Sequence, residues 1–483
     1  MILIENLDYI ATFDDDDSVV ENGSILIDGP AVAAVGSLPE ERPRADTIID
    51  GSGKMALPGF VNTHHHFFQQ LTRAMPSVHR ASILDWLRTL YPIWACIDEE
   101  IVHHATLLAG AQLLKTGCTT TSDMAYFYPF GRTNLIDAEI AAARELGIRF
   151  HPCRATLVEM EGRLGDQLSA AGLPVSDLVE DKGQALQEFE RVVHRYHDSS
   201  RFSMCQVAIG QTDKTYRDPD FMHDMAALAD SCGVLLHTHL HPREDELALC
   251  RELHGQEPVD FLADTGWLGP HTWFAHATAF DDHSIERVAE AGAGVSHSPS
   301  SNMRLAYGAA PVPAMAAAGI DISVAVDGGA SNDTGDYLGE LRQAFLMHRI
   351  RGLHPAPYDG VNATEPHQLL RIGTRGGAAV LNRDDLGSLE TGKAADIVLY
   401  DMTKLDFAGG LHDPLAALIL CGESHIVDTT IVNGEILVQD GELTRLCEAD
   451  IADGANQAAA ELIDRASRLT NGTTISARRR RTL

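Results

Sequence analysis

Between about residues 57 and 384, short apolar stretches alternate with longer amphipathic segments. The apolar stretches have the length of buried strands, and the segments between them repeat with the period of helices that bury one face. The predicted strands are 57–62, 119–122, 148–153, 204–209, 234–239, 272–276, 294–297 and 322–327. The predicted helices include 98–115, 135–146, 220–231 and 281–290.

Eight strand and helix alternations over about 320 residues predict an α/β fold, a (β/α)₈ barrel with insertions. A doubly wound open sheet is the competing architecture. It is disfavoured because no glycine-rich phosphate loop follows the first strand.

Both ends of the chain have a different pattern, with short alternating stretches separated by turn signals such as Asn22-Gly23 and Asn433-Gly434. The strands predicted there are 2–6, 24–28, 32–35 and 47–50, and then 395–400, 426–432 and 436–438. The two ends are therefore expected to form one small sheet domain. Residues 449–483 are predicted to form an Ala-rich helix and a polar tail that contains Arg478–Arg481.

Composition narrows the function classes. The 483 residues are 45% hydrophobic and 22% charged, which is typical of a globular chain. With 37 Lys and Arg against 69 Asp and Glu, the formal charge is −32, so nucleic acid and anionic membrane surfaces are disfavoured partners.

Three features that the sequence lacks indicate where in the cell the protein is expected. No apolar run approaches the roughly 18–20 residues of a membrane span, and the first residues lack the pattern of a secretory signal. The eight cysteines are scattered without a C-x-x-C, so we expect a cytoplasmic protein.

Histidines are numerous, and several stand at the carboxyl ends of predicted barrel strands, where barrel enzymes collect their functional groups. His64 and His66 follow the first strand and, being two apart, face the same way. His239 ends the fifth strand and Asp327 the eighth. Three imidazoles and a carboxylate form a ligand set suited to a divalent metal such as zinc. His276 ends the sixth strand nearby.

Three neighbouring histidines have other interpretations. His65 faces away from its neighbours, so packing is its default role. His237 lies one layer deeper than His239, where support of the site is favoured over ligation. His241 is expected to be a loop residue.

The order of these motifs resembles the amidohydrolase superfamily. The motifs are PGFVNTHHH at 58–66, DWL at 85–87, GCTTT at 117–121, SPSSNMRL at 298–305, DGGASND at 327–333, GKAAD at 392–396 and LHDP at 411–414. The chain is similar to the cytosine/guanine-deaminase-like branch, which includes 8-oxoguanine deaminase, isoxanthopterin deaminase and hydroxyatrazine ethylaminohydrolase. The resemblance extends to about residue 445 and is much more specific for the branch than for the substrate.

The resemblance implies a barrel at 57–384 and a small β-sandwich from residues 1–56 and 385–448. It implies one divalent metal, zinc first and iron second, held by His64, His66, His239 and Asp327. Asp327 would also act as general base, with His276 beside the reacting water.

The substrate implied by the resemblance is a small nitrogen heterocycle. Gln69 and Trp86 are the substrate-binding residues expected from the branch, although packing roles are the alternative for both. Relatives are commonly dimeric or larger, so a homo-oligomer is expected.

Three positions depart from the branch pattern. Pro242 stands three residues after His239, where relatives carry a glutamate that protonates the ring nitrogen; Glu244 or His241 could replace it. Met124 replaces a histidine, and Gln211-Thr212 replaces a small residue and proline, which makes Gln211 a further substrate-binding candidate. These departures favour a substrate other than 8-oxoguanine.

Three functions are therefore weighed. The leading hypothesis is an aminohydrolase that removes ammonia from a cyclic amidine. The second is hydrolysis of another leaving group, or of a cyclic amide, on a triazine-like or pterin-like ring. The third is a binding protein that retains the metal without turnover, which is disfavoured because the ligands and His276 are all present.

Overall fold

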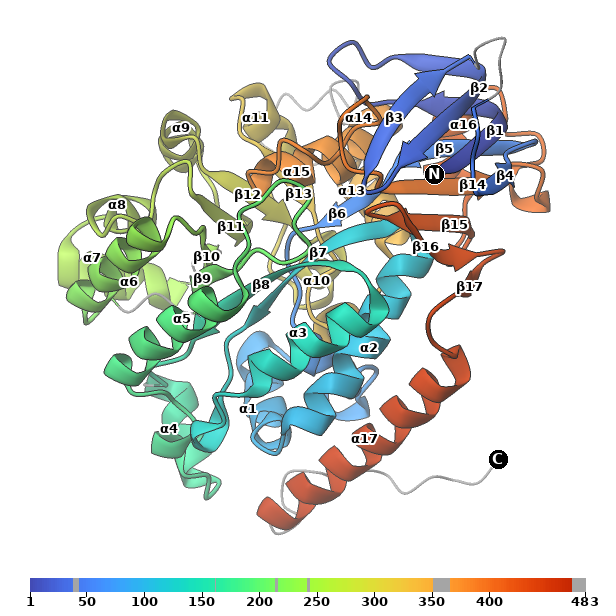
Figure 1. Cartoon of the computed structure of the whole chain (residues 1–483). Helices are drawn as coiled ribbons and strands as arrows, with labels where there is room; N and C mark the ends of the chain where they lie inside the picture. The colour runs from blue at the N-terminus through green and yellow to red at the C-terminus, as the bar shows by residue number, and fades with distance from the viewer. Residues whose placement is uncertain (38–42, 161, 213–215, 241–243, 351–364, 471–483) are drawn as a thin grey trace.

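A parallel barrel forms the centre of the computed structural model, which describes residues 1–37, 43–160, 162–212, 216–240, 244–350 and 365–470 (Figure 1). The eight strands pair in chain order, each parallel to the next. They are β6 (Phe60–Asn62), β7 (Cys118–Ala125), β8 (Arg149–Thr156), β9 (Ala208–Gln211), β10 (Leu236–Leu240), β11 (Thr272–His276), β12 (Gly294–His297) and β13 (Ile322–Val324). The predicted barrel is confirmed.

The ring is nearly closed, and its seam lies between the first and last strands. The described residues of β6 and β13 share no ladder pairing. Side chains join them instead: Asn62 Oδ1 accepts a hydrogen bond from the Val326 amide at 3.0 Å. The Thr63 hydroxyl contacts that of Ser323 and donates to Ser296 Oγ at 2.7 Å. Individual polar contacts thus hold the two strands in place.

Helices surround the barrel and several begin at the residue that the sequence predicts. Asp98 and Asp281 each accept a hydrogen bond from a first-turn amide and so act as N-caps. The longer helices are α1 (Ile83–Trp94), α2 (Glu99–Lys115), α3 (Leu135–Leu146), α4 (Gly162–Ala170), α5 (Lys182–Tyr196), α6 (Pro219–Cys232), α7 (Glu244–His254), α9 (Asp282–Ala291) and α13 (Tyr337–Met347). The shorter ones are α8 (Pro258–Asp264), α10 (Pro299–Arg304), α11 (Val312–Ala317), α12 (Gly329–Asn332), α14 (Pro366–Arg371), α15 (Gly377–Val380) and α16 (Pro414–Cys421).

Both ends of the chain meet in one mixed sheet, seen at the upper right of Figure 1. Its order is β17-β16-β15-β14-β5-β1-β2-β3, with β4 also paired to β1. The strands are β1 (Ile2–Ala11), β2 (Val19–Asp28), β3 (Ala31–Gly36), β4 (Thr47–Asp50), β5 (Lys54–Pro58), β14 (Ile397–Asp401), β15 (Val427–Val432), β16 (Glu435–Gln439) and β17 (Glu442–Leu443). Their inward side chains form a hydrophobic core separate from that of the barrel.

One predicted strand, 57–62, is two strands. Leu57 and Pro58 end β5 in the terminal sheet, and β6 begins at Phe60 in the barrel. Gly59 lies between them, against Thr119: a Cβ atom at this position would lie 2.1 Å from Thr119 Oγ1. Only glycine therefore fits where the chain passes from one sheet to the other.

A buried ion pair joins the two sheets. Arg149, at the start of β8, donates from Nη2 to Asp396 Oδ1 at 2.9 Å and from Nε to Oδ2 at 3.1 Å. Both side chains are buried, and Asp396 lies just before β14. The two-pronged contact fixes the orientation of the terminal sheet on the barrel.

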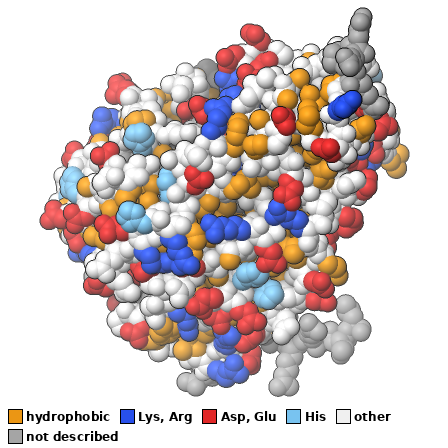
Figure 2. All heavy atoms as spheres, viewed as in Figure 1, with side chains coloured by type: hydrophobic (Ala, Val, Ile, Leu, Met, Phe, Trp, Pro, Cys, Tyr) orange, Lys and Arg blue, Asp and Glu red, His pale blue; other side chains and the backbone are white. Residues whose placement is uncertain are grey.

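Helix α17 (Glu448–Leu469) completes the described chain and packs on α2 and α1 (Figure 1). The predicted tail with Arg478–Arg481 lies outside the described residues. Over the described ranges, the helices are all too short or too polar to cross a bilayer. Acidic and basic side chains are interspersed on the face shown in Figure 2.

Candidate metal centre

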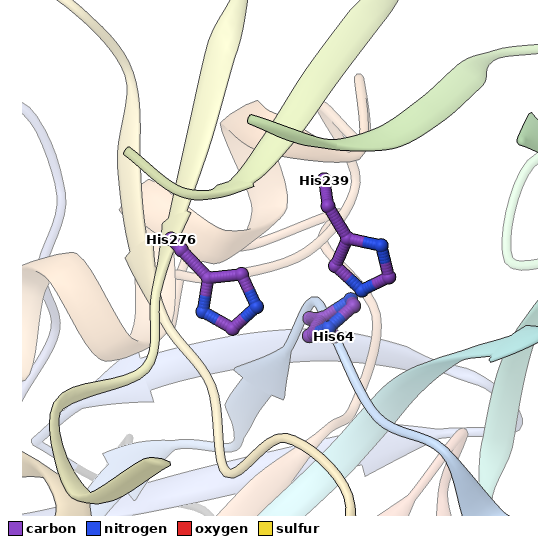
Figure 3. Close-up of side chains that lie close together, drawn as sticks. All are labelled: His64, His239 and His276. Atoms are coloured by element: carbon purple, nitrogen blue, oxygen red, sulfur yellow. The ribbon is translucent and has the colours of Figure 1, made fainter. Parts of the chain in front are cut away.

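Four strand ends bring histidines and a carboxylate to one point inside the barrel mouth. His64 and His66 follow β6, His239 lies near the end of β10, and His276 ends β11 (Figure 3). Asp327 follows β13 across the seam, where its amide donates to His64 O at 3.2 Å. All five side chains are buried. The structure therefore brings together every predicted ligand.

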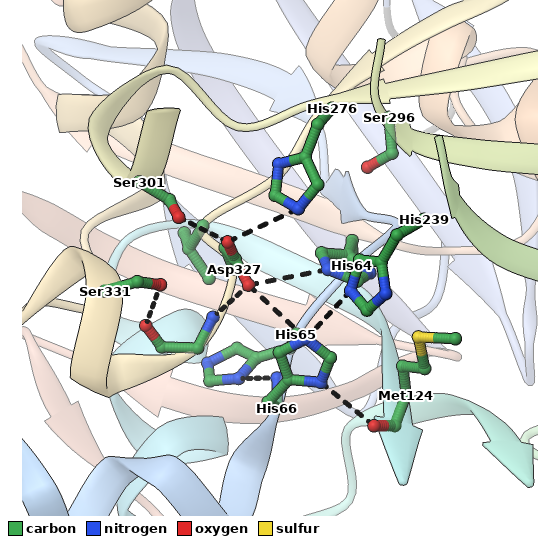
Figure 4. Close-up of polar contacts among 12 residues, drawn as sticks. His64, His65, His66, Met124, His239, His276, Ser296, Ser301, Asp327 and Ser331 are labelled. Atoms are coloured by element: carbon green, nitrogen blue, oxygen red, sulfur yellow. Dashed lines mark hydrogen bonds and ion pairs between the residues drawn. The ribbon is translucent and has the colours of Figure 1, made fainter. Parts of the chain in front are cut away.

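Asp327 is central to the cluster (Figure 4). Its Oδ1 lies 3.4 Å from His64 Nε2 and 3.6 Å from His66 Nε2. Its Oδ2 faces the other way, 3.9 Å from His276 Nε2, and accepts a hydrogen bond from the Ser301 hydroxyl. One carboxylate oxygen thus belongs with the ligands and the other with His276.

Backbone carbonyls determine which ring nitrogens carry protons. A carbonyl can only accept, so His66 donates from Nδ1 to Met124 O at 3.0 Å, and His239 donates from Nδ1 to Thr212 O at 2.8 Å. The Nε2 atoms of these two rings lie 3.3 Å apart. In the neutral rings both atoms present lone pairs, an arrangement that a cation between them would stabilise.

The same argument, applied to His237, shows which ring nitrogen of His64 carries the proton. His237 donates from Nδ1 to Trp273 O at 2.9 Å, so its Nε2 accepts from His64 Nδ1 at 2.8 Å. His64 Nε2 is then the unprotonated atom, and it is buried with no hydrogen-bond partner in the described part of the chain. The deeper histidine supports the ligand position, as its place one layer down suggests.

Burial and mutual charge keep these groups in their metal-binding protonation states. Burial, together with the neighbouring His64, lowers the pKa of His66 to about 3. Burial alone would raise the pKa of Asp327, but the adjacent His64, His276 and His66 rings hold that pKa well below the usual range. The His66 ring is therefore neutral and the Asp327 carboxylate ionised near neutral pH, as metal ligation requires.

The residues present fit a divalent metal. Two sets of residues, which share His64, each bring their ligand atoms within 4.8 Å of one another. One set is His64, His239 and His276, and the other is His64, His66 and Asp327. Nitrogen and carboxylate donors of this kind suit zinc, and ferrous iron accepts them as well. Two observations support this fit. The buried His64 Nε2 has no hydrogen-bond partner among the described residues, and the Nε2 atoms of His66 and His239 face each other.

His65 lies outside this group. Its Nδ1 accepts the His66 amide at 2.8 Å, and its ring packs edge-on against Phe67. This is the packing role expected from its alternate orientation.

A pocket opens onto the cluster, and two of the three predicted substrate residues line it. Gln69 and Trp86 are both in its wall. Trp86 is held in place because its indole N–H donates to Ala330 O at 3.1 Å. Gln211 is buried on β9 and is not among the residues that line the pocket. Its neighbour Thr212 takes that place.

The predicted acid is only partly described. Glu244 begins α7, and its side chain is not among the described atoms; His241 and Pro242 lie outside the described residues. The role predicted for Glu244 stays a prediction.

Sequence reasoning missed two kinds of residue. Three tyrosines line the pocket, Tyr91, Tyr126 and Tyr307, and nothing in their sequence spacing indicates it. Ser301 and Asn302 of α10 hydrogen-bond to Asp327 and His276. They follow β12 directly, so the strand-end rule that found the histidines could have found them.

Comparisons with known proteins agree with this geometry. The amidohydrolase family model matches residues 55–437. The chain is 38% identical over 441 residues to 8-oxoguanine deaminase of Pseudomonas aeruginosa, covering 91% of this chain and 95% of the relative. It is 34% identical over 451 residues to hydroxydechloroatrazine ethylaminohydrolase of Pseudomonas sp. strain ADP, covering 91% and 90%.

Among solved structures, the zinc complex of atrazine chlorohydrolase from Arthrobacter aurescens superposes with a TM-score of 0.86. The two proteins are 32% identical, and the match covers 95% of this chain and all of that one.

Proposed function

Because the chain belongs to the amidohydrolase family, we propose that it is a metal-dependent hydrolase that attacks a C–N bond of a nitrogen heterocycle. The simplest such reaction replaces a ring amino group with oxygen and releases ammonia. The observation that carries this proposal is the convergence of His64, His66, His239 and Asp327, the last three of which line a pocket with aromatic walls.

His64, His66, His239 and Asp327 would hold the metal, with His276 beside them. A zinc ion held there would supply an activated water, whose pKa falls from 15.7 to about 7 on such a metal. The zinc-bound neighbouring structure favours zinc, and ferrous iron is the second choice.

Asp327 and His276 have different roles, one in proton transfer and the other in hydrogen bonding to the reacting oxygen. Asp327 Oδ2 faces His276 and is positioned to take a proton from the attacking water. His276 Nδ1 donates to Asn302 Oδ1 at 2.9 Å, which directs its Nε2 toward the pocket. Once the His276 ring is protonated, Nε2 can donate a hydrogen bond to the oxygen that gains charge as the ring carbon of the substrate becomes tetrahedral.

The pocket wall suits a flat, uncharged ring. Trp86, Tyr91, Tyr126 and Tyr307 offer aromatic surfaces, and no Lys or Arg is among the described residues that line it. Gln69 offers a carboxamide for a ring nitrogen or carbonyl; its Oε1 is buried and has no hydrogen-bond partner among the described residues.

Ammonia release tests the proposal directly. We expect the purified protein to release ammonia from at least one member of a panel of amino-substituted purines, pterins and triazines. Boiled enzyme and enzyme dialysed against a chelator are the controls. A protein with its metal in place that hydrolyses no member of the panel would contradict an aminohydrolase.

A second candidate is hydrolysis of an alkylamine or halide from a triazine-like ring. The pocket wall supports it, because Ile83, Leu87 and Leu305 add aliphatic surface beside the aromatic side chains. The similarity to hydroxydechloroatrazine ethylaminohydrolase and to atrazine chlorohydrolase also supports it. Detection of free ethylamine or chloride in the same panel separates the two reactions.

Glu244→Gln tests the predicted proton donor. If Glu244 replaces the glutamate that Pro242 has displaced, this variant should lower kcat by about 10²-fold or more, because glutamine cannot protonate a ring nitrogen. Asp245→Asn, at the next position, serves as the control for disturbance of α7. Equal rates for Glu244→Gln and the wild type would assign the proton to another group.

Two further proposals concern the cellular location and the oligomeric state of the protein. We place it in the cytoplasm, because its eight cysteines form no disulfide in the described structure. We also propose a homo-oligomer, by analogy with the branch, and sedimentation of the purified protein measures it.

A further inference from the structure

Two residues of the short helix α10 hydrogen-bond to Asp327 and His276, the side chains that act on the reacting water in the proposed reaction. Ser301 donates to Asp327 Oδ2, and Asn302 Oδ1 accepts from His276 Nδ1 at 2.9 Å. The orientation of Asp327 and His276 relative to each other therefore depends on where α10 lies. A helix of six residues has few hydrogen bonds of its own to hold it there.

Glu340, on α13 behind the site, holds α10 from the other side. Its Oε2 accepts the backbone amide of Ser300 at 3.1 Å. Its Oε1 accepts Asn332 Nδ2 at 2.9 Å, and the same Nδ2 donates to Val326 O at 2.7 Å. One carboxyl group thus connects α10 to the segment that runs from Val326 through Asp327 to Asn332.

The environment of Glu340 argues against a purely stabilising role. The side chain is 1% exposed, and no Lys or Arg in the described ranges forms an ion pair with it. Burial raises its pKa to about 8. Glu180, another buried acid of the chain, is paired with Arg154. An acid buried without a cation is costly, and an apolar residue would pack there at lower cost.

We propose that Glu340 is a positioning residue of the active site. It fixes α10 against the 326–332 segment, so that Ser301 keeps Asp327 Oδ2 turned toward His276 while Oδ1 stays with the metal ligands. This inference rests on the proposed function for its catalytic part. Glu340 does not line the pocket, so it acts through Ser301 and Asn302 and does not touch the substrate.

Glu340→Gln is the informative variant because it preserves shape. Above about pH 8 the Glu340 carboxylate accepts from both donors, whereas glutamine has one acceptor oxygen and can satisfy the Ser300 amide or Asn332 Nδ2 but not both. The site should then loosen without a cavity being formed. Asn332→Ala removes the same connection from the other side and provides a second route if the first variant folds poorly.

Glu139→Gln is the matched control. Glu139 is equally buried, and burial also raises its pKa, but it lies on α3, which packs on α2 and β8 rather than on α10. The same chemical change at this position should leave the site readouts at wild-type values.

Four measurements together test the role. In Glu340→Gln, we expect faster hydrogen exchange of peptides from α10 and zinc affinity about 10-fold weaker in chelator competition. With a substrate from the panel, we expect kcat about 10-fold lower and KM within about twofold. Combining Glu340→Gln with Ser301→Ala should give less than the product of the single effects, because both act on Asp327.

The outcomes separate this inference from the proposed function. If the wild type hydrolyses nothing but Glu340→Gln still changes α10 exchange and zinc affinity, the function fails and the positioning role stands. If Glu340→Gln lowers only the melting temperature, with exchange at α10 and zinc affinity like those of Glu139→Gln, the positioning role is overturned. Fully multiplicative effects with Ser301→Ala would also overturn it.

Discussion

Replacement of Asp327 by asparagine is expected to lower kcat by about 10³-fold or more. Asparagine has nearly the same shape but cannot take a proton from water, and its neutral oxygen is a weaker metal ligand. The substitution should not strain the backbone. Asp327 has φ of 61°, in the left-handed region that Asn also tolerates. The loss should therefore report chemistry rather than misfolding, and steady-state kinetics on any panel substrate measures it.

Asp333→Asn provides the matched control for this variant. Asp333 lies six residues further along the same segment and also has a left-handed φ, 69°. It is partly exposed, pairs with Arg304 and does not line the pocket. We expect kcat within about twofold of the wild type. An Asp327→Asn enzyme that retained a tenth of the wild-type kcat would remove Asp327 as the base.

Removal of the metal is expected to abolish turnover and to lower the melting temperature. The purified protein should contain about one zinc or iron per chain. Dialysis against a chelator should reduce activity to background, since water alone is a poor nucleophile at neutral pH. Added zinc should restore both activity and melting temperature, because a ligand that binds only the folded state stabilises it. Elemental analysis, turnover and thermal unfolding measure the three effects.

Substitutions at the adjacent His64 and His65 should have opposite effects on metal binding. His64→Asn should lose the metal, because it removes the orphaned Nε2 at the centre of both ligand groups. His65→Asn should retain the metal, because its Nδ1 is turned to the His66 amide. Full activity in a metal-free, folded protein would contradict the proposed centre.

Much of the site could be predicted because a barrel places strand ends together. Residues two apart on a strand share a face, so His64 and His66 could be paired before any coordinates were known, and His65 could be set aside. The strand that ends at His276 was predicted with the bounds that the structure has. Strand-end position brings candidate ligands together, since neighbouring parallel strands meet at one rim.

Other features depend on contacts that a one-dimensional pattern does not contain. The fourth barrel strand is β9, Ala208–Gln211, rather than 204–209, because it continues through Gly210 and Gln211 after its apolar residues end. The eighth ends at Val324, and Asp327 reaches the site through a left-handed turn instead of a strand. Hydrophobicity marks where a strand is buried, but tertiary hydrogen bonding decides where it stops.

The polar seam of the barrel has a consequence for the reaction centre. The contact from Asn62 Oδ1 to the Val326 amide lies two residues before His64 on one side and one residue before Asp327 on the other. With no ladder between the described residues of β6 and β13, this carboxamide, together with the backbone contact from Asp327 to His64, sets the width across which the acid and the imidazole face each other. A longer or shorter side chain at this position would resize the coordination sphere while leaving the architecture intact.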